Sequence, residues 1–181
     1  MPGDDHVRGA EGADGARPCD GDAKQTLLPY VTPAGVFRER RATAVTRLSG
    51  CFVIDVDHLA TTREAEELRD DIGHDRRLAH LLTFVSPSGR GVKALIPWQP
   101  WRGDGWRGDE ERPFGDTPVP CDPTPEHLED WARSVREAMM YVAWTYGIGD
   151  GAAGVDNACK DVSRVCSLCH DPAAVADNIG K

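Results

Sequence analysis

A chain of 181 residues, of which 40% are hydrophobic, has enough apolar material for one domain with an ordinary core. Its formal net charge of −9 excludes a uniformly basic nucleic-acid coat, although a local basic patch remains compatible with it. No apolar run approaches the ~20 residues that cross a membrane, and the polar N-terminus does not resemble a signal peptide, so we expect a cytoplasmic protein with no membrane partner.

The first segment, residues 1–24, is rich in Gly, Asp and Ala and is predicted to be a disordered acidic tail. A single domain then covers residues 25–181. Without an export signal, its cysteines are predicted to be reduced thiols or metal ligands. A candidate basic groove is supplied by Arg38, Arg40, Arg41, Arg47, Arg90 and Lys93.

The apolar run from Cys51 to Asp57 predicts a strand that presents Asp55 and Asp57 at alternate positions. Residues i and i+2 of a strand project from the same face, so the two carboxylates point to one place. Two adjacent carboxylates repel each other unless a cation neutralises them, and a hard divalent ion takes oxygen ligands. This pattern indicates a metal site, and a solvated turn or a helix cap is the alternative.

A strand-helix-strand-strand unit follows from the next segments. Thr61–Glu64 has the spacing of a capping box, and the helix that it begins should end at Gly73. Leu78–Val85 and Val92–Ile96 read as strands, joined by the polar turn of residues 86–91. The turn supplies N–H groups and hydroxyls suited to phosphate, and a simple hairpin connection is the alternative.

Residues 97–125 form a Trp/Pro/Gly-rich insertion whose Trp and Arg side chains could stack on bases, unless it is only a variable loop. The clearest helix follows, with Thr124 as its cap and Gly147 at its end, and its apolar stripe predicts core packing. Beyond it, Val165–Cys169 reads as a strand. A zinc site in this region would crowd its ligands into one short segment and is disfavoured; those ligands would be Cys159, Cys166, Cys169 and His170.

Together, the carboxylate pair, the Ser/Gly turn and a later Asp with Lys and Arg are what a nucleotidyl-transfer site needs. Four stretches also resemble one known family. They are Leu28–Phe37, Ser49–Leu59, Phe84–Lys93 and Asp156–Cys166, the last followed by Asp171–Pro172. Over about residues 25–178 the chain resembles VirE N-terminal-like primase-polymerase domains of the archaeo-eukaryotic primase superfamily, which often occur on phages and other mobile elements.

The resemblance implies an α/β (α+β) fold with an RRM-like catalytic core, in which a mixed or antiparallel sheet is flanked by helices. It implies that Asp55, Asp57 and Asp156 are catalytic and bind Mg²⁺ or Mn²⁺, with Asp161 as the competing third acid. The residues expected to bind a nucleoside triphosphate are Ser86, Ser88, Gly89, Arg90, Lys93, Lys160 and Arg164. The other expected partners are a single-stranded DNA template and a helicase on a separate chain.

Two other functions stay open. Many superfamily members carry Ser-x-His in the second motif, whereas this chain has no His between Ser86 and Pro97. Either Lys93 replaces it, or the domain is a nucleic-acid-binding module without turnover. The enzyme alternative is a haloacid-dehalogenase-type phosphatase, with Asp55 as nucleophile, Asp57 as acid/base, and Asp150 with Asp156 as a late acidic pair. That chemistry wants a small hydroxyl residue where Leu59 stands.

Overall fold

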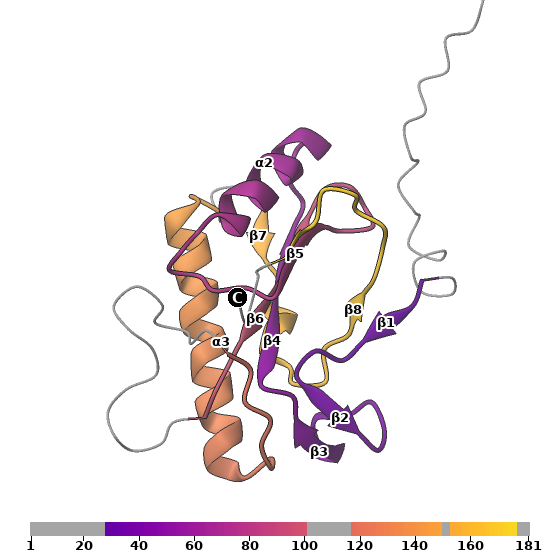
Figure 1. The fold of residues 1–181 in the computed structure, drawn as a ribbon, viewed down its shortest axis with the longest axis vertical. Helices are drawn as coiled ribbons and strands as arrows, with labels where there is room; N and C mark the ends of the chain where they lie inside the picture. The colour runs from indigo at the N-terminus through magenta and orange to yellow at the C-terminus, as the bar shows by residue number, and fades with distance from the viewer. Residues whose placement is uncertain (1–27, 101–116, 150–152, 177–181) are drawn as a thin grey trace, which may run out of the picture.

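The computed structural model describes residues 28–100, 117–149 and 153–176 (Figure 1). The predicted disordered tail, residues 1–24, lies outside the described residues, as do residues 101–116 of the Trp/Pro/Gly-rich insertion. Across the three described ranges, no helix has both the length and the apolar character to span a membrane.

One five-stranded sheet organises the chain, and each pair of neighbouring strands in it is antiparallel. Its strand order is β7-β4-β6-β5-β9. The strands are β4 (Cys51–Asp57), β5 (Leu82–Val85), β6 (Val92–Pro97), β7 (Gly154–Val155) and β9 (Val175–Ala176). The predicted α+β class, with an antiparallel sheet flanked by helices, is confirmed.

Both predicted helices form where their caps indicate. In α2 (Thr62–Gly73), Thr61 is the N-cap and its hydroxyl accepts from the N–H of Glu64 at 3.1 Å. In α3 (Pro125–Thr145), the hydroxyl of Thr124 accepts from the N–H of His127 at 3.2 Å. Each cap satisfies an N–H group that the first helical turn would leave without a partner.

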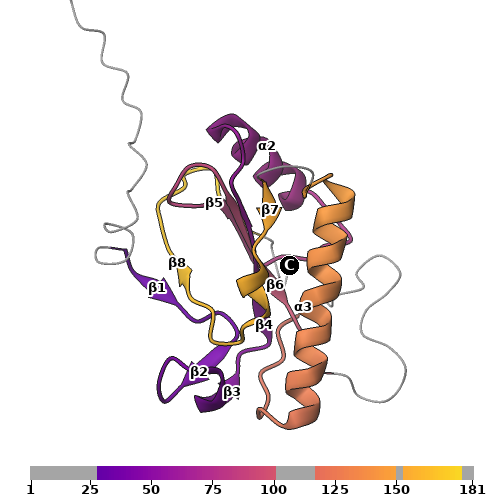
Figure 2. The ribbon, with the colours of Figure 1, turned by 180° about the vertical axis from the view of Figure 1, so that it is seen from behind.

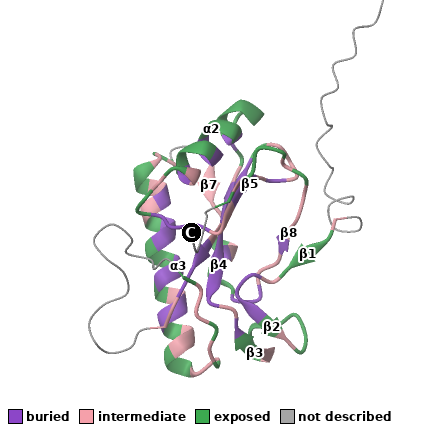
Figure 3. Cartoon of the chain, viewed as in Figure 1, coloured by how far each residue is buried: buried purple, intermediate pink, exposed green. Residues whose placement is uncertain are grey.

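Both helices cover the same face of the sheet. The α2 helix packs against β5 and β6, and α3 packs against β4 and β7 (Figures 1 and 2). The period of two along β4 directs Phe52, Ile54 and Val56 into the core beneath the helices, where the Trp131 ring meets the Phe52 ring edge-on at 6.3 Å. These three residues of β4 therefore face the buried side of α3 across this layer, and both elements show buried residues in Figure 3.

Two small strand pairs lie outside the main sheet. One joins β1 (Tyr30–Val31) to β8 (Cys166–Ser167), and the other is the hairpin of β2 (Gly35–Phe37) and β3 (Val45–Leu48), with η1 (Ala42–Ala44) at its tip. Cys166 packs with Val53 and Phe84 on the sheet face opposite the helices. The strand predicted over Val165–Cys169 is therefore shorter in the structure, where β8 contains only Cys166 and Ser167.

The predicted strand Leu78–Val85 is also too long, because it begins only at Leu82. The carboxylate of Asp75 accepts from the N–H groups of Arg77 and Leu78, at 2.8 and 3.4 Å, and turns the chain there. Leu78 is fully buried. Leu78 therefore packs into the core from a loop that precedes the strand.

Asp171 ties the C-terminal segment to α2 and β5. Its carboxylate accepts from the N–H groups of Val85 and Ala173, at 2.8 and 3.0 Å, and contacts Arg69 at 3.3 Å. Burial opposes the charged form, but the two N–H groups and the guanidinium outweigh it and hold the pKa of Asp171 below its usual value.

Because the folded-state pKa of Asp171 is lowered, its stabilising effect is present above the unfolded pKa of about 3.9 and is lost as the pH falls through the folded value. We therefore expect Asp171→Asn to lower the free energy of unfolding by about 1–3 kcal/mol at neutral pH. Urea unfolding of both proteins across the acid range measures this. A difference that stays constant down to the lowest pH would contradict the assignment.

Candidate metal centre

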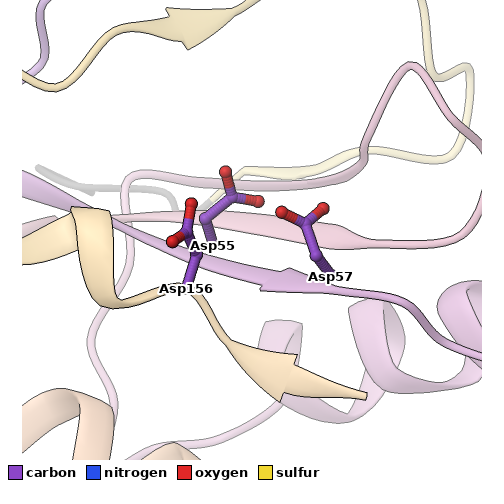
Figure 4. A group of neighbouring side chains, drawn as sticks. All are labelled: Asp55, Asp57 and Asp156. Atoms are coloured by element: carbon purple, nitrogen blue, oxygen red, sulfur yellow. The ribbon is translucent and has the colours of Figure 1, made fainter. Parts of the chain in front are cut away.

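Three aspartates, two from β4 and one that directly follows β7, meet on the sheet face opposite the helices. Asp55 and Asp57 project from the same face of β4. In the β4–β7 pair, Asp57 lies opposite Gly154. The hydrogen bonding between the two segments continues one step beyond β7, where the N–H of Asp156 donates to the carbonyl of Asp55 at 2.8 Å. One carboxylate oxygen from each aspartate lies within 4.8 Å of the other two (Figure 4). The structure thus brings together the three acids selected from the sequence.

Asp55 is the most buried of the three, with 1% of its surface exposed. Its Oδ2 atom accepts from Lys93 Nζ, directly opposite on β6, and from Arg164 Nη2 at 3.1 Å. Its Oδ1 atom is buried and has no hydrogen-bond partner. A buried carboxylate oxygen without a partner carries a desolvation penalty of about 1–3 kcal/mol or more, which a bound cation would remove.

The donor set fits a hard divalent ion, because Mg²⁺ and Mn²⁺ prefer carboxylate oxygens. Lys93 and Arg164 offset only part of the charge of three carboxylates. Arg164 Nη2 also contacts Asp156 Oδ2 at 2.5 Å. Although burial disfavours its charge, the adjacent carboxylates of Asp55 and Asp156 keep the pKa of Arg164 above its ordinary value. The guanidinium therefore stays cationic while it spans two of the acids.

A short 3-10 helix, η2 (Asn157–Lys160), follows Asp156 and contacts both Asp156 and the backbone of Asp55. Asp156 is its N-cap, and Oδ1 of Asp156 accepts from the N–H of Ala158 at 2.9 Å. The Cys159 thiol accepts from the N–H of Asp55 at 3.3 Å. Burial, reinforced by the charge of Asp55, raises the pKa of Cys159 to about 12, so this thiol stays protonated.

Within the described residues, the aspartate trio is the one group of acidic, His or Cys side chains placed as metal ligands. The cysteine-histidine set that the sequence disfavoured as a zinc site does not assemble there. From the sequence, Cys159 is predicted only as a possible zinc ligand, and its contact with Asp55 is not foreseen. No sequence pattern indicates that a cysteine three residues after a helix-capping Asp will contact the backbone of another aspartate.

A model of one protein family, the BT4734-like N-terminal domain, matches residues 22–175. This chain belongs to that family. The predicted membership of the VirE N-terminal-like primase-polymerase domains is therefore wrong, because the matching family model is a different one. The motifs behind that resemblance are short strand ends and turns, which similar site chemistry can produce in more than one family. No curated protein and no solved structure matches the chain.

The polar turn of this BT4734-like domain packs directly against the acidic cluster. Gly89 has φ of 71°, and the turn is closed by the N–H of Ser86 donating to the carbonyl of Gly91 at 2.8 Å. The hydroxyls of Ser86 and Ser88 lie 2.9 Å apart. A Cβ at Gly91 would stand 2.9 Å from Asp57 Oδ1 and 2.5 Å from the carbonyl oxygen of Val56. Only glycine permits this close approach.

The four basic residues expected to bind phosphate fall into two groups. Lys93 and Arg164 lie inside the cluster and are paired with its carboxylates. Arg90 and Lys160 are exposed and make no ion pair with the cluster: Arg90 Nε donates to the carbonyl of Leu59 at 2.7 Å, and Lys160 Nζ donates to Asn157 Oδ1 at 2.9 Å.

Asp161, the competing third acid, lies outside the cluster. Its Oδ1 accepts from the N–H and the hydroxyl of Ser163, both at 2.9 Å, so its carboxylate closes a local turn. The neighbouring guanidinium of Arg164 contacts Asp55 and Asp156.

The phosphatase alternative needs a nucleophilic Asp55 that reaches a substrate phosphorus atom. Asp55 is 1% exposed, and one of its oxygens is held by Lys93 and Arg164. Asp150, part of the late acidic pair in that reading, lies outside the described residues. The burial of Asp55 favours a ligand role over a nucleophilic one.

Proposed function

We propose that this BT4734-like domain is a metal-dependent nucleotidyltransferase of the primase-polymerase kind. The observation that carries the proposal is the meeting of Asp55, Asp57 and Asp156 within 4.8 Å, with a buried Asp55 oxygen that has no hydrogen-bond partner. Its cofactor would be Mg²⁺ or Mn²⁺, held by these three side chains. Its substrates would be a nucleoside triphosphate and a single-stranded DNA template, with a separate helicase exposing the template during replication of a phage or mobile element.

The proposed reaction is attack of a 3′-hydroxyl on the α-phosphate of the triphosphate. A bond forms between that oxygen and phosphorus while the hydroxyl proton passes to solvent water, the bond from phosphorus to the bridging oxygen breaks, and pyrophosphate leaves. A bound divalent ion supplies stabilisation of the charge on the attacking and leaving oxygens. The protein supplies orientation: β4 and β7 fix the carboxylates, and the turn of residues 86–91 presents hydroxyls beside Asp57.

Phosphate binding is assigned to the polar turn and to the two exposed cations. The hydroxyl of Ser88, the N–H groups of the turn around Gly89, and the exposed cations of Arg90 and Lys160 are suited to a triphosphate. Inside the cluster, Lys93 and Arg164 donate hydrogen bonds to the buried carboxylate of Asp55 and orient it. In this proposal, Lys93 and Arg164 orient the metal-binding carboxylates, whereas Arg90 and Lys160 bind the substrate.

The succession β4-α2-β5-β6-α3-β7 supports an RRM-like core for this chemistry. It is a β-α-β-β-α-β unit whose strands lie in the order β7-β4-β6-β5. Such a sheet, covered by helices on one face, leaves the other face for the site, which is where the aspartates lie.

One observation favours the second candidate, a nucleic-acid-binding module without turnover. Lys93 and Arg164 already pair with the carboxylates, so the cluster is held together by its own cations. A site of this kind can persist as a structural ion-pair network.

Incorporation of a labelled nucleotide on a single-stranded template, with Mg²⁺ or Mn²⁺ and with or without a helicase, separates the two candidates. The transferase proposal expects extension products. If the protein binds the template but incorporates no nucleotide under any of these conditions, the transferase proposal is rejected in favour of the nucleic-acid-binding module.

A further inference from the structure

We infer that the β2–β3 hairpin and the adjoining β1 form a docking surface for single-stranded nucleic acid, which we call the basic hairpin surface. It comprises Tyr30, Val36, Arg38, Arg40, Arg41 and Arg47, all of them exposed. The inference deepens the proposed function and rests on it in one respect, since it names where the template of that reaction would bind.

The charge of the hairpin is opposite to that of the whole chain. Between Gly35 and Leu48 there are four arginines and one glutamate, a net charge of +3 in a chain whose net charge is −9. Glu39 pairs with Arg41 at 2.8 Å. The side chains of Arg38, Arg40 and Arg47 therefore project a local positive field that attracts a polyanion.

Exposed apolar side chains accompany this charge. Tyr30 is 58% exposed and Val36 is 61% exposed, and Val36 lies across the ladder from Arg47. A group of cations accompanied by an exposed aromatic ring suits single-stranded nucleic acid, because its phosphates meet the cations and its unpaired bases stack on the ring. An acidic protein partner would use the charge but leave Tyr30 unexplained.

The base of the hairpin is fixed to the strand that carries the site. The N–H of Ser49 donates to the carbonyl of Ala34 at 2.9 Å, and Leu48 and Cys121 exchange backbone hydrogen bonds at 2.9 and 3.2 Å. Leu48 is fully buried in the main core. The surface is therefore held in a defined position relative to β4, which begins at Cys51.

The position suits a template that leads to the acidic cluster. Both ribbon views place the hairpin at the end of the sheet where β4 begins, on the side of β1 and β8 and away from α2 (Figures 1 and 2). Asp55 lies four residues beyond Cys51, or about 13 Å along the strand, which a few nucleotides span. Helix α2, after the other end of β4, carries five acidic and two basic residues, a net charge of −3. Polyanion binding is therefore favoured at the hairpin end.

The test measures binding of a fluorescent oligo-dT by anisotropy at several salt concentrations. The variant Arg38→Ala/Arg40→Ala/Arg47→Ala should bind at least about tenfold more weakly at low salt. The slope of its salt dependence should be shallower by about 0.7 for each phosphate that the arginines no longer neutralise. Tyr30→Ala should weaken binding by about tenfold without changing the salt dependence, because it removes stacking rather than charge.

A matched control removes three exposed arginines elsewhere, in Arg76→Ala/Arg133→Ala/Arg136→Ala, and should bind close to the unchanged protein. The inference is overturned if the control loses as much affinity as the hairpin variant, if the unchanged protein does not bind oligo-dT, or if it binds poly-glutamate equally well. Thermal unfolding checks that all variants are folded. Binding through the hairpin without nucleotide incorporation would reject only the proposed function, whereas incorporation with unaltered binding by the hairpin variant would reject only this surface.

Discussion

Replacing Asp156 with Asn is expected to lower nucleotide incorporation by about a thousandfold, because a metal ligand set contributes several kcal/mol to phosphoryl transfer and each 1.36 kcal/mol is a factor of ten. The substitution preserves the structural role of the residue. Its Oδ1 caps η2 by accepting from Ala158, and the Asn side-chain oxygen can do the same. What is lost is the charge that faces Arg164 and Asp55.

Asp161→Asn is the matched control, since it removes a neighbouring carboxylate from a residue that only closes a turn with Ser163. It should incorporate nucleotide at close to the rate of the unchanged protein. Circular dichroism and thermal unfolding should show both variants folded. Equal activity of Asp156→Asn and the unchanged protein, or equal loss in both variants, would show that Asp156 is no ligand of the reaction centre.

Gly91→Ala should weaken Mn²⁺ binding by about tenfold to a hundredfold, the effect typical of losing the support of a metal ligand. The added Cβ would stand 2.5 Å from the carbonyl oxygen of Val56 and 2.9 Å from Asp57 Oδ1. Neither separation is tolerated, so the Asp57 carboxylate or the turn has to move. Overpacking of this kind also costs about 1–3 kcal/mol of stability.

Gly154→Ala provides the control for this substitution. Gly154 lies opposite Asp57 on β7, yet a Cβ there meets no atom within 4 Å. Calorimetric titration with Mn²⁺ should find its affinity unchanged. If Gly91→Ala binds Mn²⁺ as tightly as Gly154→Ala does, the turn is not the support of Asp57.

The elements that could be predicted from the sequence are those specified by local signals. Thr61 and Thr124 mark helix starts, and the alternation along Cys51–Asp57 places both aspartates on one face. Asp156 came from a resemblance to a family that proved to be the wrong one, yet it lies beside Asp55. A motif can therefore predict the position of a site residue correctly even when it does not identify the family.

The pairing between distant strands could not be predicted. Lys93 was expected to bind phosphate, because it follows the polar turn in the sequence. The structure places it opposite Asp55, since β6 lies between β4 and β5 in the sheet. Arg164 and Cys159 likewise meet Asp55 across more than 100 residues of sequence. Such contacts depend on strand order, which no local pattern encodes.

The proposed function requires that Asp55, Asp57 and Asp156 bind a divalent cation. Calorimetric titration of the unchanged protein with Mn²⁺, beside the Asp55→Asn/Asp57→Asn variant, tests this most directly. We predict one saturable binding event at the cluster in the unchanged protein and its loss in the folded double variant. The same Mn²⁺ affinity in both proteins would show that the carboxylates are structural caps and would contradict the metal centre.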